Sequence, residues 1–103
     1  MTGLGEIMKQ AQRMKAEMDR IQAEVGTKTV EGSAGGGMVT AVANGRGELL
    51  SVKIDAEVLR SEDREMLQDL VTAAANDALR KARELLAHEV SRVAGGMGLP
   101  GLF

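Results

Sequence analysis

The stretch LGEIMKQAQRMKAEMDRIQAEV, residues 4–25, contains the pattern that decides the fold. Its apolar residues recur at alternating spacings of three and four, the period of one face of an α-helix. They are Leu4, Ile7, Ala11, Met14, Met18, Ile21 and Val25. Good helix formers fill most other positions, and there is no Pro. At 1.5 Å per residue the helix would span roughly 33 Å, so we expect part of it to project from a small domain. Gly26 is the expected stop.

The same residues can be placed on heptad positions a and d. Leu4, Ile7, Ala11, Met14, Met18 and Ile21 then form a seam that can pack on a second helix, including that of another copy of the chain. These side chains include Ala and flexible Met, so they define a coiled coil less strongly than the Ile and Leu of a zipper. A helix packed on its own sheet explains part of the seam equally well, and both arrangements can hold, with one end docked and the other projecting.

Three short strands are expected after this helix. They are TKTVEG (residues 27–32), MVTAVA (38–43) and ELLSVKID (48–55). SAGGG joins the first two, and NGRG joins the last two as a hairpin, because Asn-Gly accepts positive φ at both turn positions. Leu50, Val52 and Ile54 share one face of the third strand, so we expect one side of the sheet to be packed and the other wet.

A second long helix is expected over residues 61–94. Ser61 is a suitable N-cap, and acidic residues follow it in the first turn. The candidates for its buried face are Met66, Leu67, Leu70, Val71, Ala74, Ala78, Leu85 and Val90. GGMGLPGLF, residues 95–103, is expected to be a flexible tail. The order α-β-β-β-α, with one antiparallel sheet and two long helices, predicts a single α+β domain over residues 1–103.

Composition limits the kinds of protein this can be. The chain has 103 residues and no Cys, so disulfides, thiolate metal sites and Cys nucleophiles are excluded. It has seven Met, and Phe103 is the only aromatic residue, so a stacking platform for single-stranded nucleic acid is excluded too. No segment reads as a signal peptide or a membrane span, and we expect a cytoplasmic protein that does not contact membranes.

The residues that could serve an enzyme or a metal site are better explained by structural roles. His88 lies near Glu84 and Glu89 on the second helix, but no nucleophile motif accompanies it. The segment GSAGGG resembles a phosphate loop only loosely, because a strand follows it rather than a helix. Glu62, Glu65 and Asp69 share a helix face and suit a solvated first turn better than a cation site. We expect no enzymatic activity, cofactor, metal or small-molecule substrate.

Charge is segregated along the chain, although the formal net charge is only −2. Residues 9–20 and 80–92 each contain four basic residues and two acidic ones, whereas residues 62–77 contain five acids and one base. Such segregation lets an acidic protein hold a local positive surface for phosphates. A mixed, solvated helix face is the competing explanation. The candidate DNA-binding residues are Lys9, Arg13, Lys15, Arg20, Arg80, Lys81 and Arg83.

Several motifs resemble those of the YbaB/EbfC family of bacterial nucleoid-associated proteins. IMKQAQRM (residues 7–14), VKIDAEVL (52–59) and EMLQDLVTAAANDA (65–78) carry the resemblance, and AGGGMV, NGRGE and GMGLP follow the same order. The resemblance covers nearly the whole chain. It implies an α-β-β-β-α fold, a tweezer-like homodimer with projecting helices, and binding of double-stranded DNA at the nucleoid with a role in gene regulation. Lys9 falls inside the matching MKQAQ motif.

Two functions remain open from the sequence. The first is a non-enzymatic, homodimeric nucleoid-associated protein that contacts DNA phosphates. The second is a protein-interaction module that grips a partner protein with its projecting helices, because Met-rich helix faces adapt to varied partners. In the first case the basic residues matter, and in the second the seam matters.

Overall fold

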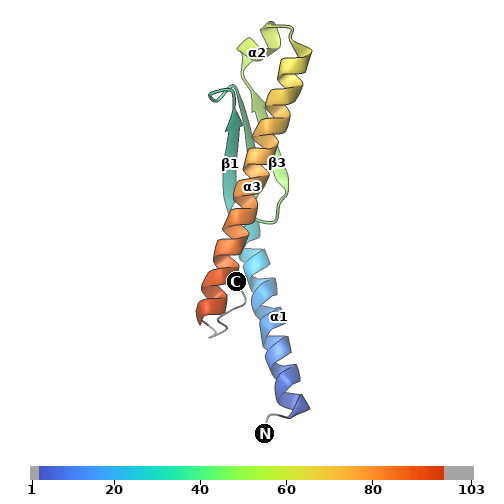
Figure 1. Cartoon of the computed structure of the whole chain (residues 1–103), viewed down its shortest axis with the longest axis vertical. Coiled ribbons are helices and arrows are strands. Elements are labelled where there is room, and N and C mark those ends of the chain that lie inside the picture. The colour runs from blue at the N-terminus through green and yellow to red at the C-terminus, as the bar shows by residue number, and fades with distance from the viewer. Residues whose placement is uncertain (1–2, 97–103) are drawn as a thin grey trace.

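The computed structural model describes residues 3–96, which form a long, narrow molecule. Its principal extents are 70 × 22 × 18 Å and its radius of gyration is 19.4 Å. A compact chain of this length has a radius of gyration of about 13 Å. The extra length comes from α1, which projects beyond the sheet at the N-terminal end of the molecule (Figure 1).

The order of elements is the predicted one, with a short helix added. The elements are α1 (Leu4–Gly26), β1 (Thr29–Ala34), β2 (Val39–Asn44), β3 (Leu49–Ile54), α2 (Ala56–Arg60) and α3 (Arg64–Gly96). The strands form one antiparallel sheet in the order β1-β2-β3. The predicted α+β class is therefore confirmed. Figure 1 shows α3 running along the length of the sheet, with its C-terminal end beside the middle of α1.

The start of the second long helix differs from the prediction. Asp55 caps α2, because its carboxylate accepts a hydrogen bond from the Glu57 backbone N–H. The Ser61 hydroxyl donates to the Val58 carbonyl at 2.6 Å, so Ser61 closes α2 instead of opening α3. Asp63 takes the capping role, since its side chain accepts from the Met66 N–H at 3.0 Å. The assignment of Ser61 as N-cap was wrong, and α3 begins at Arg64.

The end of α3 also differs from the prediction. We expected the tail to begin at Gly95, but α3 continues through Gly95 and Gly96. Ala94 is buried, so the last turns of the helix still pack on the molecule. Residues 97–103 of the predicted tail lie outside the described residues.

The core between α3 and the sheet is built from small side chains. Its buried members are Val39, Ala41, Ala43, Ala74, Ala78 and Ala82. Gly32 in β1 allows this closeness, because a Cβ at that position would lie 2.2 Å from the Ala78 nitrogen and 2.6 Å from the Ala74 oxygen. The Ala-rich segment of α3 therefore packs on the backbone of β1, and no room remains for a larger residue. Ala82 completes this surface, although it was not among the residues predicted for the buried face.

β3 is not packed as predicted. All six of its residues are exposed, because α3 lies mainly over β1 and β2. Val52 and Ile54 pair with Ala41 and Val39, so they lie on the side of the sheet that α3 covers, but next to the helix rather than beneath it. The register shifts between Val42 and Ala43, and Leu50 falls at this irregularity.

The hairpin between β2 and β3 is present, but its turn is not the expected one. Neither Asn44 nor Gly45 has positive φ, and Gly47 has φ of 86° instead. The Asn44 side-chain oxygen accepts hydrogen bonds from the backbone N–H groups of Arg46 and Glu48, and its amide donates to the Glu48 carboxylate. These side-chain bonds, together with the backbone bond from the Gly47 N–H to the Asn44 carbonyl at 3.0 Å, close a longer turn than the expected two-residue one, because Asn can bond its own downstream backbone.

Candidate nucleic-acid interface

Helix α1 divides into an exposed part and a docked part. We call residues 4–20 the α1 arm and residues 21–26 the α1 root. In the root, Ile21 and Val25 are 1% and 0% exposed. In the arm, Leu4 and Ile7 are 73% and 54% exposed. The predicted seam is therefore packed only at Ile21 within this chain, and its other members, Leu4, Ile7, Ala11, Met14 and Met18, are exposed or half-buried.

The α1 root is held by the β2–β3 hairpin. The Gly45 N–H donates to the carbonyls of Val25 at 2.9 Å and Lys28 at 3.1 Å. A Cβ on Gly45 would lie 2.5 Å from both the Val25 Cβ and its carbonyl oxygen, so only glycine fits here. The Arg46 side chain lies against Gly26 and places a cation at the C-terminal end of α1, where the helix dipole favours it. The NGRGE segment thus fixes the base of the projecting helix.

The α1 arm carries two cations that form no ion pair within residues 3–96, Lys9 and Arg13. They are one helical turn apart and line one shallow hollow together with Glu6 and Gln10. Two neighbouring cations repel each other at this spacing, and a phosphate placed between them would relieve that repulsion. The two are therefore well placed to receive an anion.

The other two basic candidates on the arm are already paired. Lys15 contacts Asp19 at 2.8 Å, and this contact raises the pKa of Lys15. Arg20 contacts Glu17 at 2.9 Å and Glu24 at 3.0 Å, and both carboxylates raise the pKa of its guanidinium, Glu17 more strongly. A phosphate that binds Lys15 or Arg20 has to compete with these carboxylates.

The three basic candidates on α3 also differ in whether they pair with carboxylates. Arg80 contacts Asp77 and Glu84, each at 2.7 Å. Lys81 contacts Asp77 at 3.3 Å and donates to the Glu31 carbonyl at 2.9 Å. Hydrogen bonds from Arg80, the Ser33 N–H and Lys81 lower the pKa of Asp77 to about 2. Arg83 is exposed and, within residues 3–96, has no ion pair.

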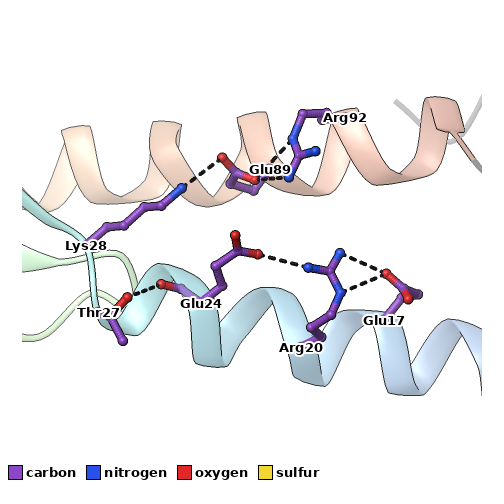
Figure 2. A network of polar contacts seen from close by, with 7 residues as sticks. All are labelled: Glu17, Arg20, Glu24, Thr27, Lys28, Glu89 and Arg92. Atoms are coloured by element: carbon purple, nitrogen blue, oxygen red, sulfur yellow. Dashed lines mark hydrogen bonds and ion pairs between the residues drawn. The ribbon is translucent and has the colours of Figure 1, made fainter.

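A second charged network joins the segment between α1 and β1 to α3, and it was missed from the sequence. Glu89 in α3 is only 7% exposed. One of its carboxylate oxygens contacts Lys28 at 3.3 Å, and the other contacts Arg92 at 2.7 Å. Figure 2 shows this group facing Glu17, Arg20 and Glu24 of α1 across the gap between the helices. The hydrogen bond from Arg92, followed by that from Lys28, lowers the pKa of Glu89 against the opposing effect of burial.

The pairs within one helix could have been found from the sequence. Arg20 stands three and four residues from Glu17 and Glu24, and Arg80 stands at the same spacings from Asp77 and Glu84. Such spacing places side chains on one helix face. Contacts such as Lys28–Glu89 join residues distant in sequence, and no local pattern indicates them.

The residues considered for chemistry are separate from this surface. His88 is exposed on α3. Within residues 3–96, no three His, Cys, Asp or Glu side chains gather in a way that could hold a metal ion. The GSAGGG segment forms the end of β1 and the following turn to β2. Among the described helices, none has the length and apolar content needed to span a membrane.

The structure is a small α+β body with a projecting helix on which Lys9 and Arg13 form no ion pair within residues 3–96. The model of the YbaB/EbfC DNA-binding family matches residues 1–97. The chain therefore belongs to the YbaB/EbfC DNA-binding family, a class of DNA-binding proteins and not of enzymes. The resemblance first indicated by IMKQAQRM and EMLQDLVTAAANDA is confirmed.

Individual relatives support this assignment over nearly full length. A nucleoid-associated protein of Syntrophobacter fumaroxidans is 55% identical over 92% of this chain and 86% of its own length. A nucleoid-associated protein of Caldanaerobacter subterraneus is 52% identical over 97% of this chain and 90% of its own. The crystal structure of an uncharacterized Helicobacter pylori protein superimposes with a TM-score of 0.75 at 26% identity, covering 94% of this chain and 98% of that one.

Proposed function

We propose that this chain is a cytoplasmic, nucleoid-associated protein that binds double-stranded DNA as a homodimer, mainly through phosphate contacts. The observation that carries the proposal is that Lys9 and Arg13, one turn apart on a helix that projects from the body, form no ion pair within the described residues 3–96. Duplex DNA presents closely spaced phosphates along its backbone, and Lys and Arg bind them without any need for aromatic stacking.

The paired candidates contribute less in this proposal. Lys15, Arg20, Arg80 and Lys81 each engage a carboxylate of their own chain. Binding a phosphate there exchanges one ionic contact for another and gains little. Arg83 is the one unpaired member of the predicted set on α3, within the residues described, and it adds a second point of contact.

The homodimer is proposed to form through β3. Its large aliphatic side chains form an exposed surface that we call the β3 strip: Leu49, Leu50, Val52 and Ile54, which are 36–55% exposed. Contiguous exposed apolar surfaces mark interaction sites. A second copy on this strip would cover the edge strand that α3 barely reaches, and it would leave both α1 arms free for DNA.

The DNA proposal is tested by fluorescence anisotropy of a labelled duplex of about 30 base pairs over a salt series. With about three to five phosphates neutralised, log affinity should fall with log salt at a slope near −3 to −4. In the variant with Lys9→Ala and Arg13→Ala, we expect at least about tenfold weaker binding and a slope smaller by about 1 per lost contact.

The matched control is Lys15→Ala with Arg80→Ala, which removes the same charge from paired positions. We expect its affinity to fall by less than about threefold. Equal weakening in the two variants would show that only bulk charge matters, and no binding by the wild type at low salt would reject the DNA proposal.

The exposed part of the seam favours a second candidate function. Leu4, Ile7 and Met18 offer apolar surface on the α1 arm, and a partner protein could pack on it. Capture of a partner that survives nuclease treatment and is lost with Met14→Glu would support this function. A partner released by nuclease would speak for DNA.

A further inference from the structure

Glu89 is a charged residue whose burial the DNA-binding surface does not explain. A buried carboxylate is costly unless charged or hydrogen-bonding groups surround it. Here each carboxylate oxygen has its own cation: Lys28 from the segment between α1 and β1, and Arg92 one turn further along α3. The side chains of Lys28 and Arg92 are 45% and 57% exposed, so only the carboxylate of this network is buried and both cations reach solvent.

The position of Glu89 in the fold allows it to affect the orientation of α1. The α1 root packs by Ile21 and Val25, and it is bonded to the hairpin through Gly45. Lys28 lies two residues after the root, and its contact with Glu89 ties it to α3. Most of the α1 arm is exposed, so its direction depends on the root.

Small movements at the root become large at the binding surface. Lys9 precedes Ile21 by twelve residues, which is roughly 18 Å along a helix. A tilt of about 10° at the root would displace Lys9 by about 3 Å at that distance. That displacement is as long as a hydrogen bond, so it separates a phosphate contact from a missed one.

We propose that Glu89 is the positioning residue of the α1 arm: through Lys28 it fixes the root of α1 against α3 and so sets the direction in which Lys9 and Arg13 are presented. The consequence for DNA rests on the proposed function, whereas the effect on the arm does not. An apolar residue could fill the same space, but it would not fix a direction through oriented contacts.

The orientation of the α1 arm relative to α3 can be measured directly as a distance between two spin labels. The chain has no Cys, so labels at Gln12→Cys on the α1 arm and Asn76→Cys on α3 are specific, and both sites are exposed. The labelled protein is diluted with unlabelled protein, so that electron–electron distances within one protomer dominate. The test variants are Glu89→Gln, which keeps the side-chain volume, and Lys28→Ala, which removes the contact from its half-exposed side and leaves Glu89 paired with Arg92.

The control is Glu84→Gln. Glu84 also pairs within α3, with Arg80, but its side chain is 63% exposed and its ion pair stays on that helix. We expect both test variants to broaden the distance distribution, while the control stays within experimental error. We expect the melting temperature of Glu89→Gln to change little, because Lys28 and Arg92 remain accessible to solvent. A broader distance distribution in this variant could then not be explained by a loss of stability alone.

DNA affinity separates the two claims. We expect Glu89→Gln to bind duplex DNA about threefold to tenfold more weakly, with an unchanged salt slope, because the same phosphates are contacted by a less ordered arm. Distributions that stay narrow in both Glu89→Gln and Lys28→Ala would overturn the proposal. A broadened arm with unchanged DNA affinity would overturn its consequence for binding. Failure of the wild type to bind DNA would reject the proposed function and leave the spin-label result as the test of Glu89.

Discussion

The two outer strands of the sheet have opposite surroundings. At β1, side chains of α3 occupy the outer edge: Asp77 accepts a hydrogen bond from the Ser33 N–H, and Lys81 donates to the Glu31 carbonyl. At β3, all six residues are exposed and four of them are large aliphatics. One edge is closed by polar contacts within the chain, and the other is left apolar and open. α3 therefore protects one edge of the sheet from strand addition and leaves the other edge uncovered.

The largest expected effect comes from breaking the approach of α3 to β1. In Gly32→Ala, the new Cβ would overlap the backbone of Ala74 and Ala78. We expect a loss of about 3 kcal/mol in unfolding free energy, or roughly 12–24 °C in melting temperature. Thermal and urea unfolding followed by circular dichroism would measure it. The control is Gly5→Ala, where a Cβ meets nothing within 4 Å and helix propensity should add about 0.5–1 kcal/mol. A normal melting temperature for Gly32→Ala would show that α3 can move away from β1 at little cost.

The next effect concerns the open edge. Val52→Lys places a charge at the centre of the β3 strip, and we expect the dimer dissociation constant to rise at least about 100-fold, because the ammonium would have to be desolvated. Sedimentation equilibrium over a range of concentrations would measure this. Thr29→Lys on the exposed face of β1 is the matched control and should leave the dissociation constant unchanged. Dimers that persist in Val52→Lys would place the interface elsewhere, with the α1 seam as the next surface to test.

A smaller and pH-dependent effect comes from the closed edge. The pKa of Asp77 is about 2 in the folded protein against an ordinary value of 3.8, so the ionised group stabilises the fold above pH 4. This contribution is lost as pH falls from about 4 to about 2. Asp77→Asn should therefore melt below the wild type at pH 7, and the difference should shrink through that window. A difference that stays constant down to pH 2 would show that the carboxylate charge is not the stabilising feature.

The smallest expected effect is that of Lys81→Met. The side chain of Lys81 is 42% exposed, and loss of its contacts with Asp77 and the Glu31 carbonyl leaves groups that water can reach. We expect less than about 1 kcal/mol of lost stability, measured by urea unfolding. Combined with Asp77→Asn, the two changes should be less than additive because they share a contact. Full additivity would mean that the two residues act on β1 separately.

Much of the fold followed from local patterns. The three-and-four spacing of residues 4–25 predicted α1, and the strand propensity of TKTVEG, MVTAVA and ELLSVKID predicted the three strands in their order. The prediction failed where a competing local bond decided the outcome: Ser61 bonds Val58 and closes α2, so Asp63 caps α3. Ala74 and Ala78 were predicted on the buried face of the second long helix, yet only the structure shows that they rest on Gly32 of β1.

Less of the site could be predicted. The seven basic residues were chosen by charge and position, and that choice could not separate Lys9 and Arg13 from the neighbours that already hold carboxylates. The exposure of β3 was not predicted, because alternation gives the face of a strand but not the width of the helix layer above it. Glu89 was considered only as a neighbour of His88, since its partner Lys28 lies 61 residues away in the sequence.

The length of the molecule also decides how its mass should be read in solution. With one axis of 70 Å and two near 20 Å, even a single protomer has the frictional coefficient of a larger sphere. A gel-filtration column calibrated with globular standards would assign it too high a mass, and a monomer could pass for a dimer. Sedimentation equilibrium depends on mass and not on friction, so it reads the assembly correctly, and comparison of the two methods reports how far the α1 arm extends.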